Sequence, residues 1–242
     1  MFSRKWILTT VLVVLGALVC VRLGIWQLDR LAQRRVFNAQ VNTMRSSPPL
    51  DLPAQADLTK MEWRAVRLEG TYDFDNQVAI RNQYNENESG YHLLTPLHLP
   101  DGEAVFVDRG WIPAGGNDNP SDWRKYDQTG EIVLSGIIRL SETSTSFGGA
   151  PDPTLTPNQT GLDFWIYVNL DRIAQQTPYP ILSVYVQLDP EPDRTDPPIP
   201  FQPELDLSEG PHEGYAIQWF AFAGLLLIGY PFYLRKQESE KK

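Results

Sequence analysis

Two long apolar runs stand near opposite ends of the chain, and the residues between them follow a different pattern. Residues 6–26 (WILTTVLVVLGALVCVRLGIW) and 215–234 (YAIQWFAFAGLLLIGYPFYL) are each long enough to cover about 30 Å as an α-helix. Trp6 and Trp26 bracket the first run, as aromatic side chains do at membrane interfaces. The pattern predicts two transmembrane helices. A cleaved signal peptide is the alternative for the first run, although "ALVCV" is a poor cleavage site.

Between the two runs, a helical segment gives way to a series of extended segments. Residues 27–46 contain no Gly or Pro, so the first helix should continue outside the bilayer. Strand-like segments then follow, rich in Val, Ile, Leu, Tyr and Phe and separated by turn signals such as NENESG and PDGE. They are RAVRLEGTYDF, QVAIRNQ, GYHLLTPLHL, EAVFVDRGWI, EIVLSGIIRL, DFWIYVNL and PILSVYVQL. We expect a mainly antiparallel β domain, either a sheet or a partly closed barrel.

The predicted organisation is therefore a membrane protein with two transmembrane α-helices that flank an extramembrane β domain. Residues 114–130 read as a surface loop, and seven prolines in residues 189–211 indicate a stiff connector. The expected parts are an N-terminus (1–5), a first span (6–26), a β-rich domain with a leading helix (27–188), the connector (189–214), a second span (215–234) and a tail (235–242).

The distribution of charge predicts the orientation of the spans. Positive residues precede the first span and follow the second, so both termini should be cytoplasmic. These residues are Arg4, Lys5, Arg235, Lys236, Lys241 and Lys242. Residues 27–214 hold 14 Lys and Arg against 28 Asp and Glu, which argues against nucleic-acid binding. No Arg-rich transit peptide precedes the first span, so the bacterial plasma membrane is a simpler location than the mitochondrial inner membrane.

The chain offers few groups for a metal centre or an enzyme. A single cysteine, Cys20, and three histidines argue against a zinc or copper site built from Cys and His. His92 and His98 would lie about 20 Å apart on an uninterrupted strand, Pro96 should break that strand, and both histidines read as ordinary sheet residues. No nucleophile elbow or phosphate-binding loop is present, so we expect a protein that is not an enzyme.

The start of the last apolar run carries unusual chemistry for an anchor. In a helix, His212, Tyr215, Trp219 and Phe222 fall within an arc of about 80°, and Gln218 lies near the same level. One interpretation is an interfacial aromatic belt with a histidine. The other is a contact surface for a flat, apolar ligand that carries a metal, such as a haem with an axial imidazole.

Two further groups of residues could take part. Trp26, Gln27, Arg30 and Arg34 follow at helical spacing beyond the first span, where the arginines could pair with haem propionates or with lipid phosphates. Glycines in both spans, at 16, 24, 224 and 229, could allow close approach. In DRGWIP, residues 108–113, Arg109 and Trp111 could anchor a partner, or the strand could simply turn at Gly110 and Pro113.

Four motifs in order resemble the Surfeit locus protein one (Shy-type) family. They are LGIWQLDRLAQR, GYHLLTPL, DRGWIP and HEGYAIQWFAFA, and with the two terminal spans they cover nearly the whole chain. The resemblance implies an assembly factor for haem-copper cytochrome c oxidase that binds haem a and assists its insertion into the catalytic subunit. It implies His212 as the contact to the haem iron, with Tyr215 and Trp219 at the aromatic positions of the last motif. Arg109, Gly110 and Trp111 match the central signature.

Three hypotheses stay open at this point. The first is a haem a chaperone, in which Trp26 and Arg30 join His212, Tyr215 and Trp219, and Gln27 and Gln218 belong to the motif surface. The expected partners are the oxidase catalytic subunit, haem a synthase and membrane lipid. The second hypothesis is a scaffold without a cofactor. The third is an outer-face hydrolase or sensor, which would need a polar, concave site away from the membrane.

Overall fold

The structure is a computed structural model that describes residues 6–142, 151, 154–156, 159 and 161–239. The helices are α1 (Ile7–Ser46), α2 (Pro120–Trp123), α3 (Leu170–Ile173) and α4 (His212–Ser239), with short 3-10 helices at Leu58–Lys60, Phe74–Asn76, Arg124–Tyr126 and Ala174–Gln176. The strands are β1 (Leu50–Leu52), β2 (Ala65–Tyr72), β3 (Val78–Asn85), β4 (Glu88–His98), β5 (Ala104–Pro113), β6 (Glu131–Leu140), β7 (Phe164–Trp165) and β8 (Ile181–Leu188). The chain divides into two compact units. One comprises residues up to 40 together with residues from 205 onward, and the other comprises residues 41–204.

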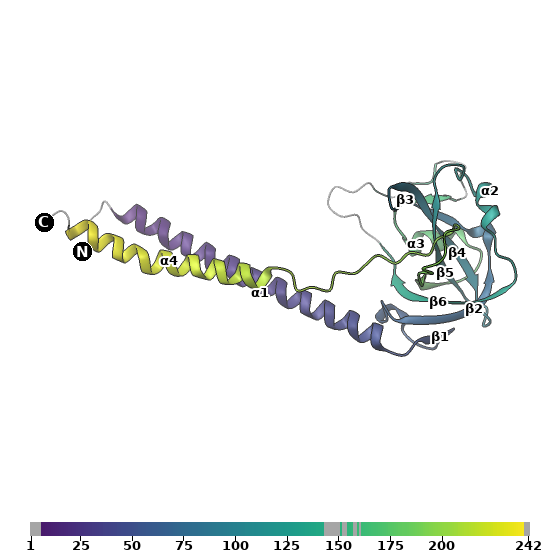
Figure 1. Ribbon diagram of the computed structural model, residues 1–242, viewed down its shortest axis with the longest axis horizontal. Helices are drawn as coiled ribbons and strands as arrows, with labels where there is room; N and C mark the ends of the chain where they lie inside the picture. The colour runs from purple at the N-terminus through teal and green to yellow at the C-terminus, as the bar shows by residue number, and fades with distance from the viewer. Residues whose placement is uncertain (1–5, 143–150, 152–153, 157–158, 160, 240–242) are drawn as a thin grey trace. The chain divides into compact units, whose positions relative to one another are not determined.

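The first unit consists of the two long helices, which lie side by side (Figure 1). α1 runs without interruption past the end of its apolar run, as the absence of Gly and Pro in residues 27–46 predicts. Both helices are long and apolar enough to cross a membrane, and only 11% of the apolar window of α1 and 6% of that of α4 are buried within the protein. The outward apolar surface of these helices therefore suits lipid.

The second unit is a sheet that curls into a partly closed barrel, which confirms the expected fold class. The strand order is β1-β2-β6-β8-β5-β4-β3-β7, and a short additional pairing of β2 with β4 closes a ring of β2, β6, β8, β5 and β4. Most ring pairings are antiparallel, but β5 and β8 are parallel, as are the outer pairs β1–β2 and β3–β7. The predicted hairpin at PDG joins β4 to β5, with Gly102 at φ 91°.

Two faces of the ring are apolar, and each face has its own cover. Alternate side chains of the ring strands fill the inside of the barrel, including Val66, Val107 and Val186. Phe106 and Tyr185 point to the other face, where residues from 162–173, among them Trp165, cover them. β5 is therefore buried along almost its whole length. A polar side chain on its outer face must find a partner inside the protein.

Two local expectations from the sequence are wrong, each for a physical reason. Only Phe164–Trp165 of the expected strand 163–170 pairs, because Asn169 caps α3 directly afterwards. Pro96 does not break β4, because it lies where β4 changes partner from β3 to β2 and its carbonyl accepts from Asp73 N. The expected surface loop 114–130 is mostly exposed, and the fully buried side chain of Trp123 anchors it in the domain.

The first half of the expected connector is part of the β domain. We call residues 197–203 the strap. Trp111 and Ile199 exchange two backbone hydrogen bonds, of 2.8 and 2.9 Å, and Gln202 Nε2 donates to the carbonyls of Gln187 and Leu188. Gly110 makes this close approach possible, since a Cβ there would lie 2.1 Å from Ile199 O and its φ is 109°.

We predict that Gly110→Ala destabilises the β domain by about 3 kcal/mol, because the new methyl group both strains the backbone and collides with the strap. Near-UV circular dichroism melts of the full chain in detergent would measure the loss. Gly102→Ala is the matched control, since Gly102 also has positive φ but a Cβ there meets nothing within 4 Å. It should cost about 1 kcal/mol, from backbone strain alone. Equal losses in the two variants would contradict the collision with the strap.

Candidate functional site

The two long helices pair antiparallel in one register. At one end Thr10 Oγ1 lies 2.8 Å from the Tyr230 hydroxyl, and at the other end His212 Nδ1 lies 2.8 Å from Gln27 Oε1. Between these contacts, Gly24 lies against the Phe220 ring so closely that a Cβ would be 2.7 Å from the ring carbon Cε1. Gly16 also faces α4, whereas Gly224 and Gly229 meet nothing across the pair. The predicted close approach therefore rests on glycines of α1 alone.

The chain segment before α4 is held against the extramembrane part of α1. Arg35 binds Glu209 with two parallel hydrogen bonds of 2.7 and 2.8 Å. Asn38 Nδ2 donates to Leu207 O, and Arg34 Nε donates to Ser208 O. The hydrogen bond and charge of Glu209 raise the pKa of Arg35, and those of Arg35 lower the pKa of Glu209. These contacts fix where α4 begins, and so they fix the height of His212 beside α1.

The His212 imidazole has one nitrogen bound and the other open. A carbonyl oxygen only accepts, so Gln27 Oε1 makes Nδ1 the donor and leaves the lone pair on Nε2. Gly210, at φ 67°, leaves space beside this edge of the ring, because a Cβ there would lie 3.7 Å from Nε2. An imidazole held by Nδ1 with a free Nε2 is the arrangement that histidine ligands of metals use.

Arg30 and His212 line the same hollow, of about 250 Å³, together with Gln33, Arg34 and Phe37. A neighbouring hollow of about 410 Å³ shares Gln33 and Phe37 and extends along α1. Each is open at the surface, and the one that His212 lines is smaller than the pockets of about 300–1,000 Å³ that enclose drug-sized ligands. A large flat ligand would therefore lie across this face of the helix pair with one side toward lipid or a partner.

The other predicted site residues on the helices differ in how exposed they are and in what they contact. Tyr215 is 48% exposed and Trp26 is 42% exposed, and Arg30 lies over the Trp26 ring at 5.7 Å. Trp219 is half-buried and meets Phe222 edge to face. Gln218 is exposed, and within the described residues its side chain makes no hydrogen bond. The structure thus joins His212 with Gln27 and Arg30, while Gln218 stays apart.

Several residues of this site escaped the sequence reasoning. Gln33 and Phe37 continue the helical spacing of Trp26 and Arg30 along α1, so that spacing could have found them. Arg35 and Asn38 gave no such signal, because their partners lie far away in sequence.

The DRGWIP motif lies inside the β domain. Arg109 and Trp111 are each only 4% exposed, and Arg109 donates to Gln77 Oε1 and Tyr126 O while its guanidinium lies over Tyr72 and Phe74. Burial lowers the pKa of Arg109, with opposing contributions from Tyr72 and Asp127. Because Gly110 admits the strap and Trp111 bonds to it, these residues organise the domain interior, and a partner could reach them only indirectly.

His92 is not an ordinary sheet residue. Its Nδ1 lies 3.0 Å from Asp108 Oδ2, and both side chains are buried. Burial alone would lower the pKa of His92, but the charge and hydrogen bond of Asp108 outweigh it and raise that pKa. The strand run alone could not reveal this pair, because Asp108 follows on the next strand. His98, by contrast, is partly exposed and packs against Tyr179.

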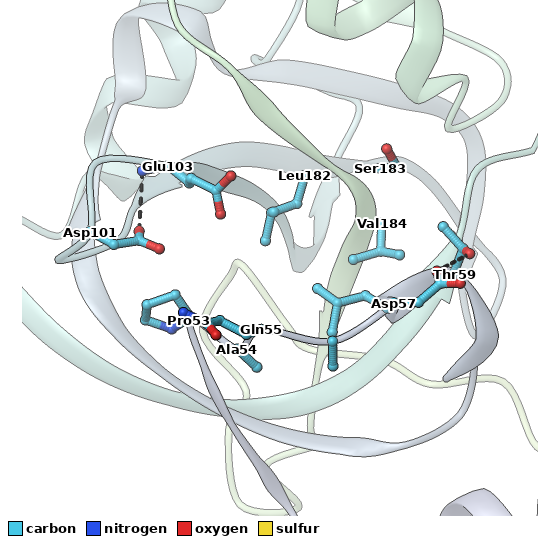
Figure 2. Close-up of a pocket in the computed structure, with 12 residues that line it drawn as sticks. Pro53, Ala54, Gln55, Asp57, Thr59, Asp101, Glu103, Leu182, Ser183 and Val184 are labelled. Carbon is cyan, nitrogen blue, oxygen red and sulfur yellow. Dashed lines mark hydrogen bonds between the residues drawn. The ribbon is translucent and has the colours of Figure 1, made fainter.

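Two hollows in the β domain bear on whether the protein could be an enzyme. The larger, of about 610 Å³, lies between residues 53–59 and the start of β8 (Figure 2). Both aspartates in its lining are engaged locally: Asp57 with Lys60 at 2.8 Å, and Asp101 with Glu103 N. The smaller, of about 230 Å³, adjoins His92, and its lining residues include no Ser, Thr, Cys or Lys. Among the described residues, no three His, Cys, Asp or Glu side chains gather to hold a metal ion.

Comparison with known proteins gives a consistent result. The sequence model of the SURF1 family matches residues 14–224. Surfeit locus protein 1 of Mus musculus is 26% identical over 214 residues, which are 82% of this chain but 66% of the mouse protein. The SURF1-like protein of Rickettsia bellii is 25% identical over 235 residues, which are 96% of this chain and 92% of that protein. The SURF1-like protein of Monosiga brevicollis is 28% identical, covering 88% and 83%.

The buried His92–Asp108 pair predicts a pH dependence of stability. Because the pKa of His92 is raised on folding, its stabilisation is complete below the ordinary value of 6.5 and is lost as pH rises through the folded-state value. Melting temperatures of the β domain should therefore fall over that window, by about 2–4 °C for each kcal/mol lost. His92→Gln should flatten this part of the profile, whereas His98→Gln should keep it. An unchanged slope in His92→Gln would contradict the assignment.

Proposed function

The chain belongs to the SURF1 family, and from this premise we propose that it is an assembly factor for haem-copper cytochrome c oxidase that binds haem a and assists its insertion into the catalytic subunit. Membership of this family supports the assembly role. The chain spans 66% of the mouse relative's length, so the complete activity and partners remain part of the proposal. Haem a synthase, as the source of the cargo, is a further expected partner.

The observation that carries the haem proposal is the His212 imidazole, held at Nδ1 by Gln27 and open at Nε2. The cargo, when bound, supplies an iron that needs an axial ligand and propionates that need cations. His212 would provide the nitrogen, and Arg30 would pair with a propionate from the same hollow. Tyr215, Trp219 and Trp26 would cover the apolar face of the macrocycle.

The open form of the site suits delivery better than storage. His212 is one ligand group beside shallow hollows, and the partner that orients its ring, Gln27, is neutral. A single ligand of this kind exchanges more readily than a closed cage with two ligands. We therefore propose binding and transfer without covalent catalysis.

A scaffold without a cofactor is the second candidate. The exposed aromatic surface of α4, including Tyr215 and Phe222, would then pack against oxidase or synthase helices. It is favoured by the absence of an enclosed pocket beside His212, because a flat partner helix needs none.

The two apolar helices and the relatives in bacteria and mammals support a membrane location. The finer assignment is a bacterial plasma membrane with both termini in the cytoplasm and the β domain outside. Arg235 and Lys236 lie at the expected inner end of α4, while residues 1–5, Lys241 and Lys242 lie outside the described residues. The anionic segment between the spans agrees with an outer location.

The haem proposal predicts that the full chain, purified from cells that make haem a, shows a Soret band. His212→Ala should abolish or shift this band because the axial nitrogen is lost, and Gln27→Ala should weaken it because the ring loses its orientation. Arg30→Ala should reduce the amount of bound haem. His98→Ala, which removes a histidine of the β domain, is the matched control and should keep the wild-type spectrum.

Two outcomes would contradict haem binding at His212. One is an unchanged Soret band in His212→Ala. The other is a colourless wild-type protein that still copurifies with the oxidase catalytic subunit, which would favour the scaffold.

The orientation predicts which cysteines react with a membrane-impermeant maleimide. In a Cys20→Ala background, Thr129→Cys in the β domain should be labelled in intact spheroplasts. Ser239→Cys, near the end of α4, should be labelled only after permeabilisation. The reverse pattern, or labelling of both in intact spheroplasts, would show that the assigned topology is wrong.

A further inference from the structure

The smaller hollow of the β domain gathers polar groups on an otherwise apolar face. It measures about 230 Å³ and lies on the outer face of the barrel, where residues 162–173 and the strap cover the sheet. Five strands contribute polar side chains to it: β3, β4, β5, β6 and β8. These side chains are Gln83, His92, Asp108, Arg139, Tyr185 and Gln187. Burying so many polar groups is costly unless each finds a partner.

The buried and half-buried acidic groups beside the hollow, Asp108 and Glu62, already have partners, and Glu142 lies at the exposed rim. Asp108 accepts hydrogen bonds from Gly110 N at 3.0 Å, from His92 Nδ1 at 3.0 Å and from Gln187 Nε2 at 3.4 Å. Glu62 Oε1 lies 3.3 Å from Arg139 Nε, as an ion pair whose angles are not those of a hydrogen bond. The buried carboxylate of Asp108 therefore offers little to a cationic ligand.

The groups that remain open are donors. Tyr185 is 4% exposed, and its hydroxyl has no hydrogen-bond partner among the described residues. Burial raises the pKa of Tyr185, so the phenol keeps its proton. His92 is bound only through Nδ1, which leaves Nε2 open, and it keeps a proton there when the ring is charged. Arg139 contacts Gln187 only at 3.5 Å, through Nη1.

Arg139 is held in place by packing. Its guanidinium lies 3.9 Å from the centre of the Trp63 ring, and Trp63 adopts φ 74°, a conformation rare for bulky side chains. Such a backbone persists only where its surroundings determine it, and it is often found at binding sites. The Trp63 ring thus holds the Arg139 guanidinium in place beside the hollow, at the cost of local backbone strain.

We propose that this hollow binds a small oxyanion, a carboxylate or phosphate group, through the Tyr185 hydroxyl, the Arg139 guanidinium and Nε2 of His92. Three convergent donors, one of them a permanent cation, match the lone pairs of such a group. Phe201 and Pro203 of the strap line the hollow, with Phe201 edge to face with His92 at 6.4 Å. The volume admits a group of a few atoms and excludes a nucleotide.

The charges that face His92 set the expected pH dependence. Asp108 pairs with it directly, Arg139 and Tyr185 face it across the hollow, and Glu142 lies at the exposed rim, where solvent screens its charge. A protonated His92 donates from Nε2, whereas the neutral ring with Nδ1 bound to Asp108 does not. Oxyanion affinity should therefore fall as pH rises through the titration of His92. This site is independent of the proposed haem site, because it involves other residues in the other unit.

Isothermal titration of the full chain in detergent at pH 6 would test the proposal, with inorganic phosphate and acetate as probes and chloride at matched ionic strength as the reference. We expect saturable binding of at least one probe. Tyr185→Phe, which removes one donor and keeps the ring, should weaken it roughly tenfold. Tyr84→Phe is the matched control, since Tyr84 is 63% exposed and does not line the hollow, and it should bind as the wild type does.

The two probes and the variants separate the possible results. Preference for phosphate or for acetate would identify the kind of oxyanion. If the wild type showed no saturable binding of either probe, the proposal would be overturned. Equal affinity in Tyr185→Phe, with the near-UV circular dichroism of the wild type retained, would also overturn it. Loss of the haem spectrum without loss of oxyanion binding would leave this proposal standing, because the two sites are separate.

Discussion

In a bilayer, two apolar helices gain little from the hydrophobic effect when they pair, because lipid is as apolar as they are. α1 and α4 must therefore pair through close packing and a few polar contacts. Gly24 gives the close approach to Phe220, and Thr10–Tyr230 and Gln27–His212 fix the register near the two ends. A shift of α4 by one turn would carry His212 about 5 Å along α1, away from Gln27. The candidate haem site depends on this register.

The interior of the β domain follows a different rule, because buried polar groups of its backbone and side chains must form hydrogen bonds with each other. Strand β5 is buried on both faces, and the bulge around Gly110 lets the strap bond to Trp111 at one end of it. The same strand places Asp108 on the outer face, where it accepts hydrogen bonds from Gly110 N and from side chains of neighbouring strands. The motif DRGWIP is therefore understandable as one structural unit, in which Asp108 binds the polar cluster and Gly110 admits the strap.

The longer elements and the class of fold could be predicted from the sequence alone, but the pairing of the strands could not. Apolar length revealed the two spans, and the alternation in residues such as Val66 and Leu68 revealed β2, because both patterns are local. The parallel pairing of β5 with β8 was not predictable, since it joins segments far apart in sequence. Likewise, the spacing of His212, Tyr215 and Trp219 was readable, but the choice of Gln27 as the partner of His212 required the helix register. The buried pairing of His92 with Asp108 could not be predicted, because Asp108 lies on another strand.

The two buried or half-buried histidines show how the charge of one neighbour separates two roles. His92 faces a carboxylate, so protonation creates an ion pair, the pKa rises, and the ring becomes a donor. His212 faces a neutral amide oxygen, which accepts a hydrogen bond from Nδ1 and orients the ring. Its Nε2 lone pair therefore stays available to a metal, and without a carboxylate behind the ring that nitrogen remains a moderate ligand. If the protein delivers haem, as we propose, release of the cargo needs that moderation, and exchanging Gln27 for an acid would favour retention over transfer.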